Sequence, residues 1–338
     1  MRLTIRTGSS TFHILPLFTT AKPLRTIALS GANPQTKDKR TRAGRVDAIQ
    51  TAFRRAGLDQ ASGALLAGLV GRGILESRTP RMHEAEGARL GLRYRYRLID
   101  FDQLRLDDDA LDEVIGFAAE IGFAGLNVTH PFKESVLASL GTIAPTAAAI
   151  GAVNTVVLLD GKRVGHNTDC WGFAESFRRG MSGVSLDHVV LIGAGGAGMA
   201  VAQALLELGV RQLSIHDLIP AKAAALAARF AGAGDRVAAI DDVAWAVRVA
   251  SGIVNASPAG MAKYPGSPVP AALLHPGVWI ADIVYFPRET VLLQAARAAG
   301  CRTLSGTGMA VFQALRAFEL ITGKTPDADH MARHFSAG

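Results

Sequence analysis

The sequence has 338 residues and a mass of 35.5 kDa, a length that is typical of two domains. Hydrophobic residues make up 49% of it and charged residues 19%, which predicts a folded chain with a sizeable core and excludes a disordered one. The two cysteines, Cys170 and Cys301, exclude a disulfide scaffold and a cysteine-rich zinc site. No stretch resembles a span of about 20 apolar residues, so we expect a soluble, cytoplasmic protein that makes no membrane contact.

The formal net charge of +7 is unevenly distributed along the chain. Residues 1–60 hold 11 Lys and Arg against 3 Asp and Glu, a net charge of +8, whereas residues 61–338 hold 25 against 26, a net charge of −1. The main part of the chain therefore lacks the basic excess that is typical of nucleic-acid binding, and we expect no nucleic-acid partner for it. We expect residues 1–60 to be a basic, disordered extension. A transit segment, a nucleic-acid-binding tail and an incorrect translation start are the alternatives.

Expected strands and helices alternate over residues 61–174, which predicts one α/β domain with a mostly parallel sheet. Short apolar runs predict strands at residues 64–71, 94–101, 124–128, 153–159 and 163–166. Apolar spacing predicts helices at residues 80–90, 111–121 and 131–140. The first and third of these begin at a proline, which suits the first turn of a helix.

A second α/β unit is expected over residues 175–304. The predicted strands are residues 188–192, 212–216, 236–240, 252–255, 278–283 and 302–304. The predicted helices are residues 199–208, 220–230, 242–249 and 288–299. Two further helices, at residues 309–321 and 327–335, belong to a C-terminal segment, residues 305–338, that we expect to return to the first domain.

A glycine-rich loop between the first strand and the first helix of this second unit indicates a dinucleotide site. Its pattern is G-x-G-x-x-G, and a strand that ends at Asp217 follows it. The loop consists of Gly193, Ala194, Gly195, Gly196, Ala197 and Gly198. Glycines let the backbone approach a pyrophosphate, and the helix N-terminus supplies amide donors. The alternative is a tight turn without a ligand, in which Asp217 only caps the next helix.

Asp217 predicts which nicotinamide coenzyme the loop accepts. A carboxylate at this strand end accepts hydrogen bonds from the ribose hydroxyls of NAD and repels the 2′-phosphate of NADP. The residues that follow, Leu218 to Pro220, include no arginine, and Lys222 is the nearest cation. The sequence therefore predicts a Rossmann domain that prefers NAD, with NADP as the less favoured coenzyme.

Four polar segments in the first domain, together with the glycine loop, carry a resemblance to a known family. The segments are residues 77–80, 127–134, 151–155 and 166–169. In their order and spacing the chain resembles the shikimate dehydrogenase family over about residues 64–335. It is most similar to the NAD-dependent quinate/shikimate dehydrogenases, on account of Thr79, His130 and Asp217. Many biosynthetic members have Ser in place of Thr79 and continue the second strand of the Rossmann domain with Asn-Arg-Thr, which suits NADP.

The resemblance implies a substrate-binding domain over residues 61–174, a cleft between it and the Rossmann domain, and a role for each matching residue. Lys133 and Asp169 match the catalytic pair of the family. The positions that match substrate-binding groups are Ser77, Thr79, Asn127, Thr129, Asn154, Tyr285 and Gln313, and Asp169 also faces the ring hydroxyls. The positions that match cofactor neighbours are Asn255, Gly308 and Met309. We expect His130 and His166 to be structural, and we expect no metal site.

Oxidation of a secondary alcohol requires the hydroxyl proton to leave as a hydride moves to the nicotinamide. A neutral lysine amine can accept that proton, while a neighbouring carboxylate holds the amine in position and favours its charged form. The pair Lys133–Asp169 therefore titrates as a unit, and which member takes the proton stays open. Hydroxyl and amide side chains suit a substrate that carries a carboxylate and vicinal hydroxyls.

These observations predict an enzyme that oxidises quinate or shikimate to the 3-dehydro acid with NAD. The alternatives are an NADP-linked biosynthetic enzyme that reduces 3-dehydroshikimate, and a non-catalytic sensor with the same fold. The expected partners are small molecules, and the two domains are expected to close on the substrate. The oligomeric state stays open, and a homodimer is compatible with the sequence.

Overall fold

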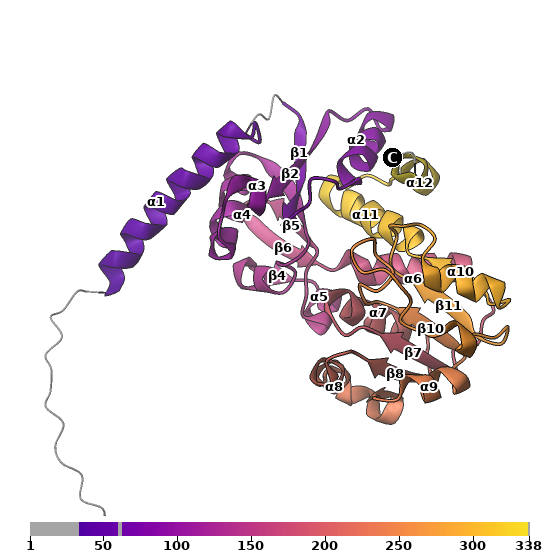
Figure 1. The fold of residues 1–338 in the computed structure, drawn as a ribbon. Coiled ribbons are helices and arrows are strands. Elements are labelled where there is room, and N and C mark those ends of the chain that lie inside the picture. Colours follow the sequence, from indigo (N-terminus) through magenta and orange to yellow (C-terminus); the bar gives the residue numbers. More distant parts are fainter. Residues whose placement is uncertain (1–33, 60–62, 337–338) are drawn as a thin grey trace, which may run out of the picture. The chain divides into compact units, whose positions relative to one another are not determined.

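The computed structural model describes residues 34–59 and 63–336 (Figure 1). The chain divides into two compact units, residues 1–42 and residues 43–338, and both β-sheets belong to the second unit. Within the described ranges, no helix combines the length and the apolar character that crossing a membrane requires. The α/β fold class with mostly parallel sheets is confirmed.

The first sheet has six strands, and its spatial order is β2-β1-β3-β5-β6-β4. Its strands are β1 (Leu65–Gly71), β2 (Tyr94–Asp100), β3 (Phe123–Val128), β4 (Thr142–Ile143), β5 (Thr155–Leu159) and β6 (Lys162–His166). Strand β1 is parallel to β2 and β3, whereas β5 is antiparallel to β3 and β6. The helices that this half of the chain supplies are α1 (Pro34–Arg55), α2 (Thr79–Arg89), α3 (Phe101–Leu104), α4 (Leu111–Glu120) and α5 (Pro145–Ile150).

The second sheet is parallel throughout and has the order β12-β11-β10-β7-β8-β9. Its strands are β7 (His188–Ile192), β8 (Gln212–His216), β9 (Val237–Ala239), β10 (Gly252–Asn255), β11 (Trp279–Asp282) and β12 (Thr303–Ser305). The helices are α6 (Thr168–Gly180), α7 (Gly196–Glu207), α8 (Pro220–Arg229), α9 (Val243–Val249), α10 (Val291–Ala298), α11 (Thr307–Thr322) and α12 (Ala328–Ser336). The strand order reverses between β7 and β10, and open α/β sheets bind ligands at such a reversal, outside the carboxyl ends of the strands.

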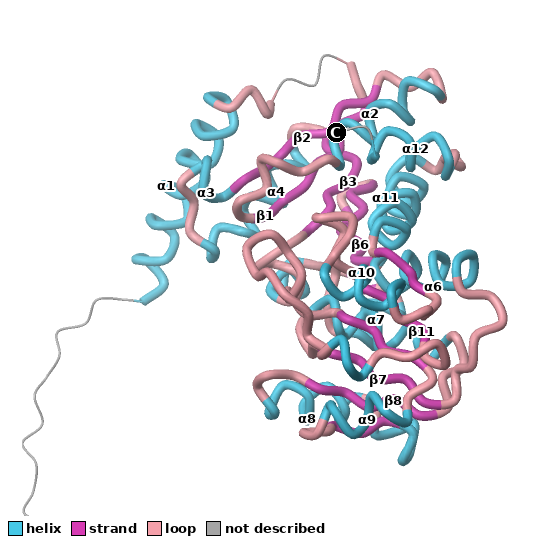
Figure 2. The backbone as a smooth tube through the Cα atoms, turned by 45° about the vertical axis from the view of Figure 1, so that its right-hand side comes forward, coloured by secondary structure: helices cyan, strands magenta, loops and turns pink. Residues whose placement is uncertain are grey.

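Helices cover both faces of each sheet. In the second sheet, α6, α7 and α8 pack on one face, and α9 and α10 pack on the other. In the first sheet, α4 packs on one face, and α2, α11 and α12 pack on the other. Helices α11 and α12 follow the last strand of the second sheet in sequence, and Figures 1 and 2 show them beside α2 of the first half of the chain.

The expectation of a disordered extension is wrong for residues 43–59. Helix α1 runs to Arg55, and its residues Ile49 and Phe53 are fully buried in the core that contains α4. The ring of Phe53 meets that of Phe117 edge to face, with centroids 5.2 Å apart. Ile49 and Phe53 lie one helical turn apart, and their burial stabilises this end of the helix. Because basic residues surround this apolar pair, the sequence pattern did not reveal it. Residues 1–33 lie outside the described part of the chain.

The helix expected at residues 131–140 is also wrong. The chain passes through turns as far as Glu134, and only a short 3-10 helix, Ser135–Ser139, follows. The carbonyl oxygen of Lys133 accepts the N–H of Val153 at 2.8 Å, so it is not available to a helix. Burial of Phe132 against Phe101, with ring centroids 4.5 Å apart, holds the turn on the core. Tertiary contacts override the local preference here.

Candidate active site

A close ion pair lies at the centre of the site. The Nζ atom of Lys133 is 2.5 Å from Oδ2 of Asp169, and the two side chains keep 24% and 10% of their surface exposed. Charge-assisted hydrogen bonds of this kind are short and roughly twice as strong as neutral ones. The pair is partly enclosed and still reaches solvent, an arrangement that suits proton transfer.

Two local structures bring these side chains together. Lys133 lies in the turn after β3, which Phe132 holds on the core. Asp169 lies in the first turn of α6, and the side chain of Asn167 caps this helix by accepting the N–H of Cys170 at 3.2 Å. A carboxylate in the first turn of a helix is stabilised by the helix dipole. Helix α6 was not among the expected elements, although Asp169 was singled out.

One pocket of about 870 Å³, including its open mouth, surrounds the ion pair. The structure brings all nine predicted catalytic and substrate-binding residues to its wall, from both halves of the chain. These residues are Ser77, Thr79, Asn127, Thr129, Lys133, Asn154, Asp169, Tyr285 and Gln313. The pocket therefore combines an ion pair, three amides, one phenol and three aliphatic hydroxyls.

Asn154 presents a defined hydrogen-bond donor to this pocket. Its Oδ1 accepts the N–H of Thr168 at 2.7 Å and the hydroxyls of Thr155 and Thr168 at 3.2 Å each. The backbone N–H can only donate, so it fixes the amide with Oδ1 turned inward. The Nδ2 group, which makes none of the hydrogen bonds found within the described residues, is left to donate to a ligand.

Close approach of α6 and α11 brings Gln313 to the same wall. A Cβ atom at Gly172 would lie 2.6 Å from the backbone N of Gln313 and 2.9 Å from the carbonyl oxygen of Met309, so only glycine fits there. The Nε2 of Gln313 donates to the carbonyl of Ala310 at 3.1 Å. The amide is held at the rim of the pocket as a result.

The loop between β1 and α2 supplies two hydroxyls, and its arginine points elsewhere. The hydroxyl of Ser77 donates to Oγ1 of Thr79 at 3.1 Å. Between them, the Arg78 guanidinium lies over the ring of Phe286, 5.6 Å from its centroid, and donates to the carbonyl of Phe335 at 3.4 Å. Arg78 therefore contacts Phe286 and α12 and does not line the pocket.

Several lining residues were not predicted. They are Leu69, Val128, Ile283, Gly306, Ala310 and Phe335. The ring of Phe335 packs against that of Tyr285, with centroids 5.6 Å apart, and Tyr285 remains 48% exposed. In the sequence, the only indication for Phe335 is its spacing of four residues from Met331 in an otherwise charged helix. This spacing predicts a buried helix face, but it does not predict that the face lines a pocket.

The glycine loop lies at the carboxyl end of β7 and leads directly into α7. Gly193 has a φ of +105°, and a Cβ there would lie 2.7 Å from the backbone of Ala256. A Cβ at Gly198 would lie 2.1 Å from the carbonyl oxygen of Gly193. Both glycines are therefore required by the fold itself. Ala197 is the one member of this loop that lines the described pocket.

Gly195 differs from these two glycines because the protein does not need it for packing. A Cβ atom at this position would meet nothing within 4 Å, and the φ of −80° suits any residue. The open space lies at the N-terminus of α7, where no side chain caps the backbone N–H groups. Such a terminus is suited to a pyrophosphate, so the loop fits a dinucleotide.

Asp217 is tied to this loop by backbone hydrogen bonds. Its Oδ2 accepts the N–H of Ala194 at 2.8 Å, and its Oδ1 accepts the N–H of Ile219 at 2.9 Å. It forms no ion pair with any described residue. Its negative charge is therefore held beside the N-terminus of α7 without a neutralising cation.

The three other residues expected near a cofactor have different positions. Met309 lines the pocket, but Asn255 and Gly308 do not. Asn255 is fully buried: its amide donates to Oδ1 of Asp282 and to the carbonyl of Ala259, at 2.9 Å each. A Cβ at Gly308 would lie 2.2 Å from Oγ of Ser176. Both residues shape the backbone behind the site.

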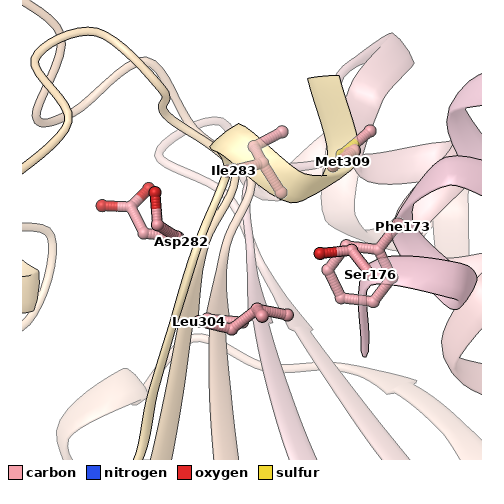
Figure 3. Close-up of a pocket in the computed structure, with 9 residues that line it drawn as sticks. Phe173, Ser176, Asp282, Ile283, Leu304 and Met309 are labelled. Atoms are coloured by element: carbon pink, nitrogen blue, oxygen red, sulfur yellow. The ribbon is translucent and has the colours of Figure 1, made fainter. Parts of the chain in front are cut away.

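A narrow crevice between α6 and the strands β11 and β12, too tight to hold a water molecule, extends to Met309 (Figure 3). Figure 3 shows Ser176 and Phe173 on one side of it and the Asp282 carboxylate pointing away from them. Burial raises the pKa of Asp282, while hydrogen bonds from Thr290, Val284 and Asn255 oppose that rise. The crevice is a packing seam, and Asp282 holds the adjoining loops.

No group of three or more His, Cys, Asp or Glu residues in the described ranges could hold a metal ion. We expected no helix to carry two histidines at i and i+4, but His330 and His334 have this spacing on α12. Nδ1 of His330 is 2.8 Å from Oε2 of the buried Glu86, and Nδ1 of His334 bonds the carbonyl of His330 at 3.0 Å. The contact with Glu86 attaches α12 to α2.

Comparisons with known proteins agree with this architecture. The model of the shikimate dehydrogenase substrate binding domain matches residues 69–156, and that of the shikimate 5′-dehydrogenase C-terminal domain matches residues 306–334. A shikimate dehydrogenase (NADP(+)) of Streptomyces avermitilis is 53% identical over 79% of this chain and 93% of its own length. A quinate/shikimate dehydrogenase (NAD(+)) of Corynebacterium efficiens is 47% identical over 80% of this chain and 98% of its own length.

A solved structure is similar over the same range. The quinate dehydrogenase of Corynebacterium glutamicum in complex with NAD is 44% identical, has a TM-score of 0.78, and covers 80% of this chain and 98% of its own. The Rossmann sheet, the glycine loop and the ion-paired pocket define a nicotinamide-dependent oxidoreductase that acts on alcohol groups. The chain belongs to the shikimate dehydrogenase family.

Proposed function

We propose that this protein oxidises quinate or shikimate to the 3-dehydro acid, with NAD as the hydride acceptor. The observation that carries the proposal is the Lys133–Asp169 pair, 2.5 Å apart, in a pocket that Asn154 and two hydroxyl side chains also line. A carboxylate with vicinal hydroxyls offers complementary groups to every one of these side chains. Relatives named for quinate and for shikimate support this substrate class.

Each proposed contact follows from the chemistry of the side chain. The hydroxyl of Thr79 donates to the substrate carboxylate, and that of Ser77 does the same once it turns away from Thr79. The Nδ2 group of Asn154 donates to a ring hydroxyl. The proton of the reacting hydroxyl passes to the Lys133–Asp169 pair, which returns it to solvent. Lys133 also stabilises negative charge that develops on the alcohol oxygen.

The glycine loop and Asp217 would hold the coenzyme, which supplies an acceptor for the hydride that leaves the carbinol carbon. The space at Gly195 and the N-terminus of α7 support a pyrophosphate site. The uncompensated carboxylate of Asp217 supports NAD, because it would repel the 2′-phosphate of NADP. The adjacent Leu218 is 94% exposed and brings no positive charge.

We also propose a division of labour between the two halves of the chain. Residues 61–174 would bind and orient the substrate, residues 175–304 would bind the coenzyme, and the helices of residues 305–338 would complete the substrate pocket. The lining of the pocket supports this division, because the first sheet and its loops supply most of the polar side chains, α11 and α12 close the pocket, and Ala197 of α7 brings the glycine loop to its edge.

One observation favours a second candidate, the reduction of 3-dehydroshikimate with NADPH. The relative from Streptomyces avermitilis, at 53% identity, is named a shikimate dehydrogenase (NADP(+)). The same pocket chemistry serves either direction, so the coenzyme region distinguishes the two candidates, and Asp217 favours the NAD-linked one.

The test is product analysis with the purified full-length protein. With quinate or shikimate and NAD, we expect NADH and the keto acid to form in equal amounts. Formation of product from NADPH and 3-dehydroshikimate alone would favour the second candidate, and no turnover with either acid and either coenzyme would overturn the proposal.

A further inference from the structure

A buried phenol lies directly behind the pocket and contacts one of its amides. Tyr96, on β2, is 3% exposed, and its hydroxyl is 2.7 Å from Oδ1 of Asn127 at the end of β3. The strand between them, β1, pairs Ala67 with Tyr96 and Leu69 with Asn127. The small side chain of Ala67 leaves room for the phenol to pass over the sheet.

The direction of this hydrogen bond follows from the other contacts of Asn127. Its Nδ2 is 3.3 Å from the backbone carbonyl oxygen of Asn154, which can only accept. The amide nitrogen must therefore face that carbonyl, and Oδ1 must face Tyr96, so the phenol is the donor. Burial raises the pKa of Tyr96 well above its usual value, so the phenol keeps its proton.

The remaining capacity of the Asn127 amide is then defined. Nδ2 also donates to Oγ1 of Thr155 at 2.9 Å, which uses its second hydrogen. Tyr96 occupies one of the two lone pairs of Oδ1. One lone pair is left, so Asn127 offers an acceptor to the pocket, whereas Asn154 offers a donor.

A neighbouring tyrosine on the same strand has no such link. Tyr94 is 2% exposed and packs against Phe318, with ring centroids 5.2 Å apart, but its hydroxyl is 3.1 Å from Nδ1 of His83. Tyr96 is further anchored by its backbone N–H, which donates to Oε1 of Glu84 on α2 at 2.9 Å. The two phenols lie on the same strand and are almost equally buried, but only the hydroxyl of Tyr96 is hydrogen-bonded to a residue that lines the pocket.

We propose that Tyr96 is a positioning residue that holds Asn127 with Oδ1 as an acceptor, so that the pocket selects substrates with a hydroxyl that donates at this point. This inference rests on the proposed function, because it assigns a substrate contact to Asn127. Without the phenol, Oδ1 loses a buried donor, and only the two hydrogen bonds of Nδ2 still hold the side chain, so the amide becomes less well fixed.

The test compares Tyr96→Phe with the matched control Tyr94→Phe, each in the full-length protein. Loss of one partner of a buried hydrogen bond weakens an interaction by about tenfold to hundredfold when expressed as an equilibrium constant. We therefore expect kcat/KM for quinate or shikimate to fall by about that factor in Tyr96→Phe. The KM for NAD should change less than about twofold. Tyr94→Phe should leave both kinetic constants near those of the wild type, although its melting temperature falls.

A double variant separates positioning from general destabilisation. In an Asn127→Ala background, Tyr96→Phe should cost nothing further, because contacting residues are coupled. Additive losses, or equal kcat/KM in Tyr96→Phe and Tyr94→Phe with an active wild type, would overturn the inference. If the wild type itself oxidises neither acid, the proposed function fails. In that case NMR tests the positioning role without an activity measurement. The side-chain NH₂ resonances of Asn127 should broaden in Tyr96→Phe and stay unchanged in Tyr94→Phe.

Discussion

The Nζ atom of Lys133 lies 2.5 Å from Oδ2 of Asp169, although one residue follows a strand of the first sheet and the other begins α6. The backbone of Lys133 is fixed by a hydrogen bond to Val153, and the start of α6 is fixed by the Asn167 cap. The pair is therefore positioned by the fold before any ligand binds.

Removal of either member of this pair should abolish most of the activity. General acid–base groups contribute about a hundredfold to ten-thousandfold to the rate, so Lys133→Ala and Asp169→Asn should lower kcat by factors in this range. Coenzyme binding, measured by titration of NADH fluorescence, should be unchanged. Lys162→Ala, which removes an exposed lysine from β6, serves as the control. Activity in Lys133→Ala equal to that of the control would contradict the assignment.

Coenzyme preference should depend on Asp217. Removal of a like charge from the 2′-phosphate region should raise the ratio of kcat/KM for NADP to that for NAD by about tenfold or more in Asp217→Ala. Asp187→Ala serves as the control, because it removes an equal charge just before the start of β7, whereas the glycine loop follows the end of β7. Asp187 forms an ion pair with Arg211 there. An unchanged ratio in Asp217→Ala, matching that of the control, would remove Asp217 from the coenzyme site.

The mouth of the pocket should depend on the C-terminal helix. Phe335→Ala removes the ring that packs on Tyr285 and lines the pocket. We expect the KM for the acid substrate to rise by about threefold to tenfold, in line with the loss of one aromatic contact, with a smaller change in the KM for NAD. Ser336→Ala alters the neighbouring exposed side chain and should have no effect. Equal constants for the two variants would show that Phe335 only stabilises α12.

Stability should fall in mild acid because of His83. This side chain is fully buried, burial lowers its pKa to about 3, and its Nε2 has no hydrogen-bond partner among the described residues. The unfolded chain binds a proton near the ordinary histidine pKa of 6.5 and the folded chain does not. Above about pH 6.5, His83 therefore does not lower the free energy of unfolding. As the pH falls from 6.5 towards 3, protonation of the unfolded chain lowers the free energy of unfolding progressively.

Urea unfolding of the wild type and of His83→Gln checks this expectation. Between about pH 7 and pH 5, the free energy of unfolding of the wild type should drop by about 2 kcal/mol more than that of the variant. The comparison uses the pH dependence of each protein, so a lower overall stability of the variant does not affect it. Parallel pH profiles would mean that folding does not lower the pKa of His83.

The site was predictable where its chemistry is local in the sequence. Asn127 and Lys133 lie in one polar segment that begins at the end of a strand, and Gly193 to Gly198 form a loop between a strand and a helix. The carboxyl ends of parallel strands lie at the same edge of a sheet. Polar segments that follow different strands are therefore expected to line one pocket, although they are far apart in the sequence.

Other features depend on contacts that a sequence does not display. The stretch after Pro131 reads as a helix, but Val153 takes the carbonyl of Lys133. Asn255 matches a cofactor neighbour, but its amide is used by Asp282 and Ala259. Tyr96 reads as a buried strand residue, and only the three-dimensional register across Ala67 brings its hydroxyl to Asn127.

The most direct test of the account is a set of initial rates for the wild type and Lys133→Ala, with quinate and shikimate, each with NAD and NADP. We predict NAD-linked oxidation of at least one acid by the wild type, weak NADP-linked rates, and rates near the background for Lys133→Ala. Oxidation that proceeds with NADP only, or that survives the loss of Lys133, would contradict the account.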